Sequence, residues 1–248
     1  MSTRNRLRSL FTLVLINGLI PIRTQPLYVV SLLASPLSFL FFIYIVSGGH
    51  LLQYGVLGGM ILTMLSVGTS LQSDLTHYRH DLKFQDVVVA SPVEAPIYVA
   101  GMALSELVYS LPALAVFVVI FVAEGWATPF TVAVLTGVLL LVWGFASAFA
   151  FTLATYFQDV RETFLFSPII SLVLTVLPPV YYPITALPGW AQVAARFSPT
   201  TYAAELVQGA VGLSSLTGSA AVVDWLVLAA FAAALFVIAG VKARWRDP

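Results

Sequence analysis

The chain contains no cysteine and few charged residues of either sign. Its 248 residues include 11 Lys and Arg and 11 Asp and Glu, so that 9% are charged, whereas about 25% is usual in soluble domains. The lack of cysteine excludes disulfide bonds, thiolate metal sites and a cysteine nucleophile. The shortage of charge, together with 60% hydrophobic residues and a mean hydropathy of +0.97, is typical of a protein with several membrane spans.

Charge is missing altogether from long stretches. Residues 24–73 contain no Asp, Glu, Lys or Arg, and only Ser47 to His50 interrupts their apolar run. A helix needs about 20 apolar residues to cross roughly 30 Å of hydrocarbon, and a charge at its centre costs at least ~2.5 kcal/mol. These residues therefore predict two spans joined by a tight turn. Because the stretches are apolar without alternation, they favour helices over a transmembrane barrel.

Charge clusters and Gly or Pro breaks divide the chain into six expected spans. The sequence predicts an all-α fold, a single polytopic transmembrane bundle over 1–248 with helices at about 26–47, 53–73, 96–122, 129–157, 163–182 and 223–241. Ten of the eleven Lys and Arg residues would then lie on one side and only Arg196 on the other. The positive-inside rule places both termini on the cytoplasmic side.

An amphipathic pattern precedes the first span. Apolar residues recur at helical spacing on one face, and Arg4, Arg8 and Thr12 lie on another; the apolar set is Leu7, Leu10, Phe11, Val14 and Leu15. This pattern predicts an N-terminal interfacial helix at about 5–20 that lies along the cytoplasmic surface of the membrane. A simple membrane anchor and a partner-binding role are both compatible with it.

The largest cytoplasmic loop, 74–95, combines charge with apolar side chains. Tyr78, Leu82 and Phe84 would be exposed to water unless they contact something. We therefore expect a short helix that docks on a partner, the alternative being a capped extension of the second span. The loop also holds His77 and His80 near two Asp residues, but no second cluster completes a metal site, and we expect no metal.

The segment 183–213 is apolar but too broken by Pro and Gly to cross the membrane. Pro188 and Pro199 stand at expected helix starts, and Ser198 is suited to cap the second helix. The sequence predicts two short helices that enter the outer leaflet and return as a re-entrant pair. We expect Trp190 and Tyr202 at the level of the outer headgroups.

Glu106 is the one carboxylate expected well inside a span. It lies ten residues after Pro96, which is about 15 Å along a helix. An intramembrane acid is retained where it has water, a partner or a neutralising proton. A role in transport, and a structural role with bonds to Ser105, Ser110 or a neighbouring helix, both remain open.

Several motifs together resemble the membrane subunits of ABC exporters of the ABC-2 type. The outer segment reads Pro183-Ile184-x-x-Leu187-Pro188-x-Trp190 and then Phe197-Ser198-Pro199-x-Thr201-Tyr202-x-x-Glu205. The charged loop ends in Ala90-Ser91-Pro92, and Arg161-Glu162 precedes the fifth span. Gln208 departs from the family pattern, in which many relatives have a basic residue.

The resemblance implies a transmembrane permease that works with two copies of an ABC ATPase subunit. The second permease would be another copy of this chain or a paralogous one, and the coupling loop to the ATPase would include Tyr78, Arg79, Asp81, Leu82, Lys83 and Phe84. The outer re-entrant motif would include Pro183, Pro188, Trp190, Pro199, Tyr202 and Glu205. Neither Lys83 nor Lys242 follows Gly-x-x-x-x-Gly. We therefore expect this chain to be no enzyme and to bind no cofactor, with ATP and Mg used by the partner.

The expected substrate follows from the fifth span, which is apolar on every side. If this span lines the route as in relatives, the substrate is hydrophobic or amphipathic, drug-like or lipid-like. Export of a polysaccharide or lipid-linked glycan is the alternative, and a proton-coupled secondary carrier using Glu106 is the alternative of another class. Membrane lipid is an expected partner, nucleic acid is not, and the expected location is the plasma membrane.

Overall fold

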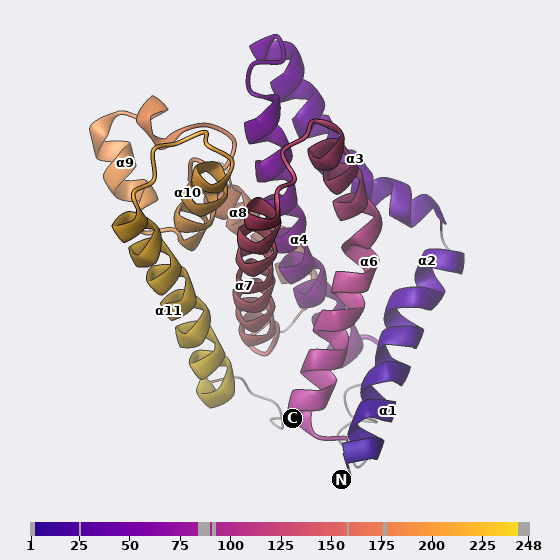
Figure 1. Ribbon diagram of the computed structural model, residues 1–248. Coiled ribbons are helices and arrows are strands. Elements are labelled where there is room, and N and C mark those ends of the chain that lie inside the picture. Colours follow the sequence, from indigo (N-terminus) through magenta and orange to yellow (C-terminus); the bar gives the residue numbers. More distant parts are fainter. Residues whose placement is uncertain are drawn as a thin grey trace.

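The computed structural model describes residues 3–24, 26–83, 90, 93–157, 159–175 and 178–242, and all regular elements among these residues are helical (Figure 1). The predicted all-α fold is thus confirmed. The elements are α1 (Thr3–Val14), the π-helix η1 (Leu15–Leu19), α2 (Ile20–Thr24), α3 (Pro26–Ser47), α4 (Leu52–His80), α6 (Ala95–Ala123), α7 (Pro129–Ala154), α8 (Val160–Thr175), the 3-10 helix η2 (Ile184–Ala186), α9 (Gly189–Ala195), α10 (Pro199–Ala210) and α11 (Gly218–Lys242).

Among the described residues, five helices are long and apolar enough to cross a membrane. They are Asn5–Thr24, Leu52–His80, Ile97–Ala123, Pro129–Ala154 and Gly218–Val241. Four of them, in α4, α6, α7 and α11, correspond to predicted spans. α3 has the bounds predicted for the first span, but it contains Pro36, and its described apolar run is the shorter Pro36–Ser47. α8 has 16 residues, which is about 24 Å of helix and less than the hydrocarbon thickness.

Local sequence explains where the long helices begin. Gly48 and Gly49 have φ of 58° and 88° in the turn between α3 and α4, a conformation that glycine adopts without steric cost. The Thr128 hydroxyl accepts from the backbone N–H of Thr131 at 3.1 Å and caps α7. α6 begins after Glu94 with proline in its first turn, where the missing N–H costs nothing.

Four helix ends differ from the predicted bounds, those of α4, α8 and α7 at their C-termini and that of α11 at its N-terminus. α4 continues to His80, so the first residues of the expected loop are part of the span; basic side chains in its last turn favour this helix end. α8 ends at Thr175 and not near residue 182, since residues 178–182 turn back, with Val180 N donating to Pro178 O at 2.8 Å. α7 ends at Ala154, and α11 begins at Gly218.

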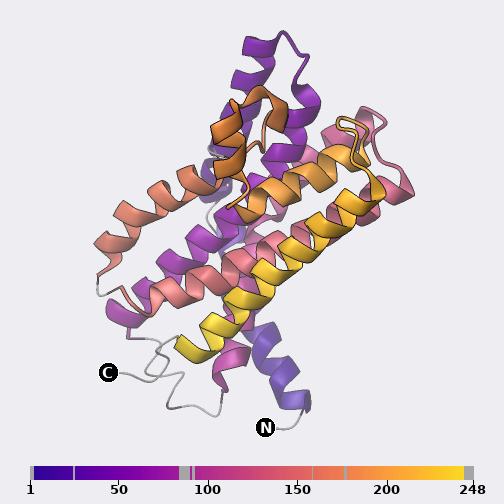
Figure 2. The same ribbon diagram turned by 90° about the vertical axis from the view of Figure 1, so that its left-hand side faces the viewer.

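α4 is the central helix of the bundle. It packs against α3, α6, α7, α8 and α10, and Val56, Met60, Ile61 and Leu71 are completely buried. Figure 2 shows α4, α7 and α11 running at a common tilt, and α7 packs against both of the others. The core therefore lies along α4, and whatever moves α4 acts on most of the molecule.

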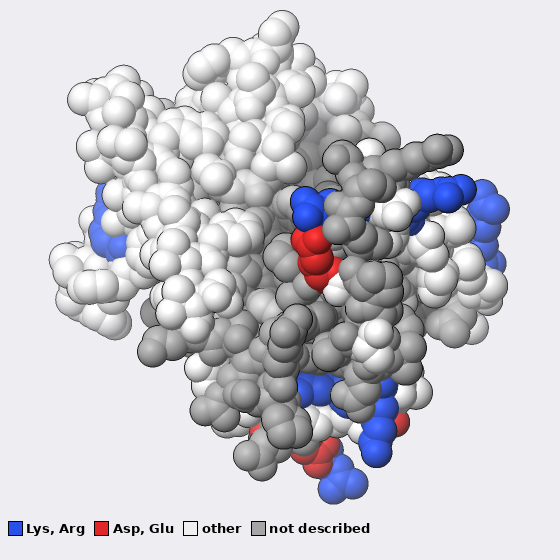
Figure 3. All heavy atoms as spheres, turned by 90° about the horizontal axis from the view of Figure 1, so that it is seen from below, with Lys and Arg blue, Asp and Glu red and all other residues white. Residues whose placement is uncertain are grey.

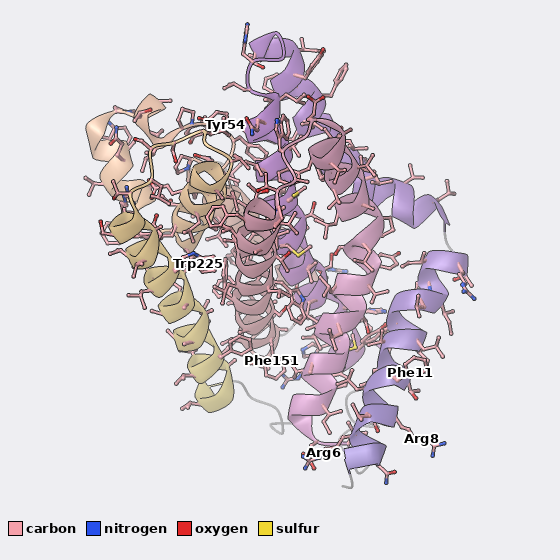
Figure 4. All side chains as sticks on the ribbon, viewed as in Figure 1. Arg6, Arg8, Phe11, Tyr54, Phe151 and Trp225 are labelled. Atoms are coloured by element: carbon pink, nitrogen blue, oxygen red, sulfur yellow. The ribbon has the colours of Figure 1, made fainter. Side chains whose placement is uncertain are left out.

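The N-terminal segment lies along α6. α1 and η1 pack on α6, and the lower end of α1 is tied to the start of α6 by an ion pair of Arg6 with Glu94 at 2.8 Å. Leu7 and Phe11 face away from the bundle, as Figure 4 shows for Phe11, and are 65% and 64% exposed. Arg23 lies in α2, at the opposite end of this segment from Arg6 and Arg8. The interfacial position stays a prediction.

The segment from residue 178 to α10 packs against α4. The ring of Tyr181 stacks on Phe39 with ring centroids 4.9 Å apart, and a Cβ at Gly58 of α4 would lie 2.5 Å from that Tyr181 ring. The chain then forms η2, α9 and α10, so the two short helices that the sequence predicts are present (Figure 1). Gly58 is required here because the turn approaches α4 too closely for any side chain.

Candidate functional site

The residues expected in the coupling loop do not all face outward. Tyr78 donates its hydroxyl hydrogen to Asn17 Oδ1 at 3.1 Å, which joins α4 to the π-helix η1. Arg79 Nη1 donates to the carbonyl oxygen of Thr155 at 2.9 Å, and His80 Nε2 lies 3.0 Å from the carbonyl oxygen of Phe157. Tyr78, Arg79 and His80 thus hold the end of α4 against the N-terminal segment and the end of α7.

The next residues of the loop are exposed. Asp81 pairs with His77 Nδ1 at 2.6 Å, Leu82 is 58% exposed, and Lys83 has a positive φ of 50°. Phe84 lies outside the described residues. No group of three or more His, Asp or Glu side chains in the described part of the chain is arranged to hold a metal ion.

The face that carries this loop also collects charge. Figure 3 views the molecule from below and shows acidic and basic side chains on this face. Arg6 and Arg8 lie at the lower end of α1 (Figure 4), and exposed Asp159 and Arg161 lie around the start of α8. At the opposite end the described basic side chain is Arg196.

Glu106 is buried within the bundle. It is 6% exposed on α6, where it lines a small cavity. The serines proposed as partners bond elsewhere: Ser105 Oγ donates to Gly101 O at 2.7 Å, and Ser110 Oγ donates to Leu107 O at 2.8 Å.

A small cavity of about 20 Å³ adjoins Glu106. It lies between α3, α4 and α6. Most of its lining surface is apolar, and the polar side chains that reach it are Thr63, Ser66, Ser70, Glu106, Tyr109 and Ser110. A cavity of this size holds one water molecule when two or more polar groups face it.

A pattern in the sequence identifies this polar region in retrospect. Thr63, Ser66, Ser70 and Asp74 recur every three or four residues within an apolar helix, and Glu106 and Ser110 do so on α6. Such spacing puts each set on one face of its helix. Two polar faces in lipid are expected to meet each other, and α4 and α6 do pack together.

At the opposite end, an arginine and a glutamate join α9 to α10. Arg196 Nη1 and Nη2 donate to the two carboxylate oxygens of Glu205 at 2.5 Å and 2.9 Å. The Tyr202 hydroxyl donates to the carbonyl oxygen of Arg196 at 2.8 Å, and the Arg196 guanidinium carbon lies 5.7 Å from the Tyr202 ring centroid. Burial raises the pKa of the Glu205 carboxyl, and the Arg196 guanidinium partly offsets this rise.

Other residues of the outer motif shape the backbone. Pro183 and Pro188 immediately precede η2 and α9, and Pro199 is the first residue of α10 after Ser198. The Ser198 hydroxyl lies 2.8 Å from that of Thr200 and makes no bond to the backbone of α10, so the predicted side-chain cap is absent. Gln208 Nε2 donates to the carbonyl oxygen of Pro179 at 3.1 Å. Trp190 is 77% exposed.

These features define a helical membrane protein with several apolar spans. One end carries exposed charged side chains, and at the other end Arg196 and Glu205 join α9 to α10. The sequence profile of the ABC-2 type transporter family matches residues 9–211. The chain belongs to the ABC-2 type transporter family, and the resemblance inferred from its sequence motifs is confirmed. No curated protein matches the chain.

Proposed function

We propose that this chain is the transmembrane permease subunit of an ATP-driven exporter and that ATP is hydrolysed by two copies of a separate ABC ATPase subunit. The observation that carries the proposal is membership of the ABC-2 type transporter family over residues 9–211. Proteins of that family are membrane components, and ATP hydrolysis needs a phosphate-binding loop that neither Lys83 nor Lys242 belongs to.

The proposed orientation has the charged end in the cytoplasm of the cell, with the chain in the plasma membrane. Arg6, Arg8, Lys83 and Arg161 are at this end, and a cytoplasmic excess of Lys and Arg is the rule for helical membrane proteins. Both termini are then cytoplasmic. α9 and α10 face the outside, where Glu205 pairs with Arg196.

The proposed docking surface for the ATPase is the exposed chain after α4. Tyr78 and Arg79 are held inside the permease by hydrogen bonds, so docking falls to Leu82 and the residues that follow it. Since α4 packs against five other helices, movement of this loop by the ATPase would be transmitted along α4 to most of the bundle.

An apolar face on α8 supports a second permease and an apolar route. Leu165, Ile169, Leu172 and Val173 are between 49% and 69% exposed on this short helix. We propose that two permease chains place such faces opposite each other and that the substrate is hydrophobic or amphipathic. No contact in the described residues favours a polysaccharide or lipid-linked glycan.

The test is copurification of this chain with ABC ATPase subunits that are produced together with it in the same cells. Leu82→Asp should reduce recovery of the ATPase at least about tenfold, because burial of a leucine contributes roughly 1.5–3 kcal/mol and a buried unpaired carboxylate opposes binding. Leu82→Met is the matched control and should keep the ATPase bound. Undiminished copurification with Leu82→Asp would exclude Leu82 from the interface, and failure of the wild-type chain to bind any ATPase would contradict the proposed function.

A further inference from the structure

Two arginines near the start of α1 differ in what they contact. Arg6 pairs with Glu94 at 2.8 Å, immediately before α6 begins. The Arg8 side chain is exposed, and it forms no hydrogen bond or ion pair with any residue that the structure describes. Figure 4 shows Arg6 pointing towards α6 and Arg8 pointing away from the bundle. The charge and the N–H donors of the Arg8 guanidinium are therefore available to a ligand.

The exposed face of the N-terminal segment forms an apolar stripe beside Arg8. Its four side chains follow each other at intervals of four residues and are between 38% and 65% exposed: Leu7, Phe11, Leu15 and Leu19. Arg8 and Thr12 lie in the neighbouring row and line an open groove together with the first two members of the stripe. The face thus offers an apolar surface with a basic group and a hydroxyl group at one end.

The N-terminal segment and α6 run side by side in the same direction. Their first contact is the ion pair of Arg6 with Glu94. Further along both helices, a Cβ at Gly101 of α6 would lie 2.6 Å from Cδ1 of Leu13. Because the two contacts occur in the same order along each helix, the helices are parallel. An apolar chain that lies along the stripe is therefore parallel to α6 as well.

The start of the α6 span sets the level of Arg8 in the membrane. The apolar span begins at Ile97, three residues after Glu94. Arg8 therefore lies where the hydrocarbon meets the lipid headgroups. From Leu7 to Leu19 the stripe extends about 18 Å along a helix, and one leaflet of hydrocarbon is about 15 Å thick, half of the bilayer core. The stripe thus has the length of one lipid leaflet.

We propose that the N-terminal segment binds an anionic phospholipid of the leaflet at the charged end of the protein. The Arg8 guanidinium binds the lipid phosphate, the exposed Thr12 hydroxyl donates a further hydrogen bond to it, and one acyl chain lies along the stripe. An anionic lipid is preferred because the choline group of a zwitterionic lipid offsets the attraction between its phosphate and Arg8. The site does not depend on the proposed ATPase partner.

Fluorescence quenching in lipid nanodiscs tests the site. The chain has no cysteine, so Leu15→Cys carries a single bimane fluorophore on the stripe, and Val119→Cys carries it at an exposed position near the other end of α6. Brominated phosphatidylglycerol or brominated phosphatidylcholine is added as a minor component to phosphatidylcholine nanodiscs.

The two fluorophore positions should respond differently to the anionic lipid. At residue 15, brominated phosphatidylglycerol should quench as strongly as phosphatidylcholine that is about fivefold more concentrated, which is the factor that one arginine contributes near a membrane surface. At residue 119 the two lipids should quench equally. Equal quenching by the two lipids at residue 15 would overturn the proposal.

Variants with the same loss of charge assign the preference to Arg8. In the Leu15→Cys background, Arg8→Gln should abolish the preference for phosphatidylglycerol. Arg23→Gln removes an exposed arginine at the other end of the N-terminal segment and should leave the preference unchanged. An unchanged preference in folded Arg8→Gln, or an equal loss in both variants, would contradict a site at Arg8. Relief of quenching by soluble glycerol phosphate would contradict a lipid as the ligand.

Discussion

Arg196 and Glu205 at one end of the molecule, and Arg6 and Glu94 at the other, are the same chemical pair in different surroundings. The Arg196 side chain is 46% exposed and Glu205 only 11%, whereas Arg6 and Glu94 are 50% and 42% exposed. The first pair has two hydrogen bonds and a stacked tyrosine, and the second has one hydrogen bond. The end formed by α9 and α10 thus encloses its acidic side chain, and the end that carries the loop after α4 leaves both partners in contact with solvent.

The difference extends to the neighbouring backbone. At the outer end, Gln208 and Thr200 bond to carbonyl oxygens of other segments, those of Pro179 and Leu174, at 3.1 Å and 2.7 Å. At the loop end, exposed Leu82 and Lys83 follow directly after α4. At the first end, Gln208 and Thr200 are bonded within the chain, although Trp190 and Phe197 are exposed there. The other presents apolar and charged side chains outward, as expected for a surface that a partner covers.

The largest loss of stability is expected from substitution of Gly58, where the turn at Val180 and Tyr181 packs closely on α4. Gly58→Leu should lower stability by about 3 kcal/mol or more, since a side chain at this position meets the Tyr181 ring and the carbonyl oxygen of Val180 within 2.8 Å. Thermal unfolding in nanodiscs measures the effect. The control is Gly240→Leu, where a Cβ has open space; it should be neutral or stabilising by roughly 0.8 kcal/mol through helix propensity. Equal effects of the two substitutions would contradict the close packing at Gly58.

A smaller effect is expected for Arg196→Ala. The free energy of unfolding should fall by about 1–3 kcal/mol at neutral pH, because Glu205 is left enclosed without its partner. This value lies between those for exposed and buried ion pairs. Adding Glu205→Gln should recover part of the loss. The substitution also removes the offset to the raised pKa of Glu205, so the folded variant keeps the Glu205 proton to higher pH.

The sign of the pH dependence follows from that shift. A carboxyl group whose pKa is raised in the folded state stabilises that state at low pH, and the contribution is lost as the pH rises through the folded pKa. The difference in free energy of unfolding between wild type and Arg196→Ala should therefore be small in acid and grow toward neutral pH. If this difference in free energy of unfolding is constant with pH, the ionisation of Glu205 does not contribute to it.

The smallest effect is expected at the loop end. Glu94→Gln removes the exposed ion pair with Arg6 and should change stability by only about 0.2–1 kcal/mol, less at high salt. The same unfolding assay at low and high ionic strength checks this value. A loss as large as that of Arg196→Ala would mean that the two ends do not differ in the way their charges are held.

The sequence identified the helices well because membrane spans depend on length and on absence of charge. α3, α6 and the start of α7 lie within a residue or so of their predicted bounds. The errors fall at ends where tertiary contacts decide. Hydrogen bonds from Tyr78 and Arg79 hold the last turns of α4, and the turn at residues 178–182 shortens α8. Neither contact has a signal in local composition.

The candidate site was less predictable from sequence than the fold. Glu106 is conspicuous as an acid within an apolar run, and Pro188 and Pro199 mark helix starts through their missing N–H groups. Pairing is different, because it depends on how two helices are rotated against each other. Asp74 was assigned to a loop, and Arg196 was counted only as an exception to the charge rule, although it donates two hydrogen bonds to the carboxylate of Glu205.

The account as a whole rests on the two ends lying on opposite sides of the membrane, with the loop after α4 inside. Because the chain has no cysteine, single cysteines report accessibility without background. Ser215→Cys, in the exposed turn after α10, should react with an impermeant thiol reagent added to intact cells. Lys83→Cys should react only after the membrane is made permeable. Labelling of Lys83→Cys in intact cells, or protection of Ser215→Cys until permeabilisation, would contradict both the orientation and the proposed docking of the ATPase.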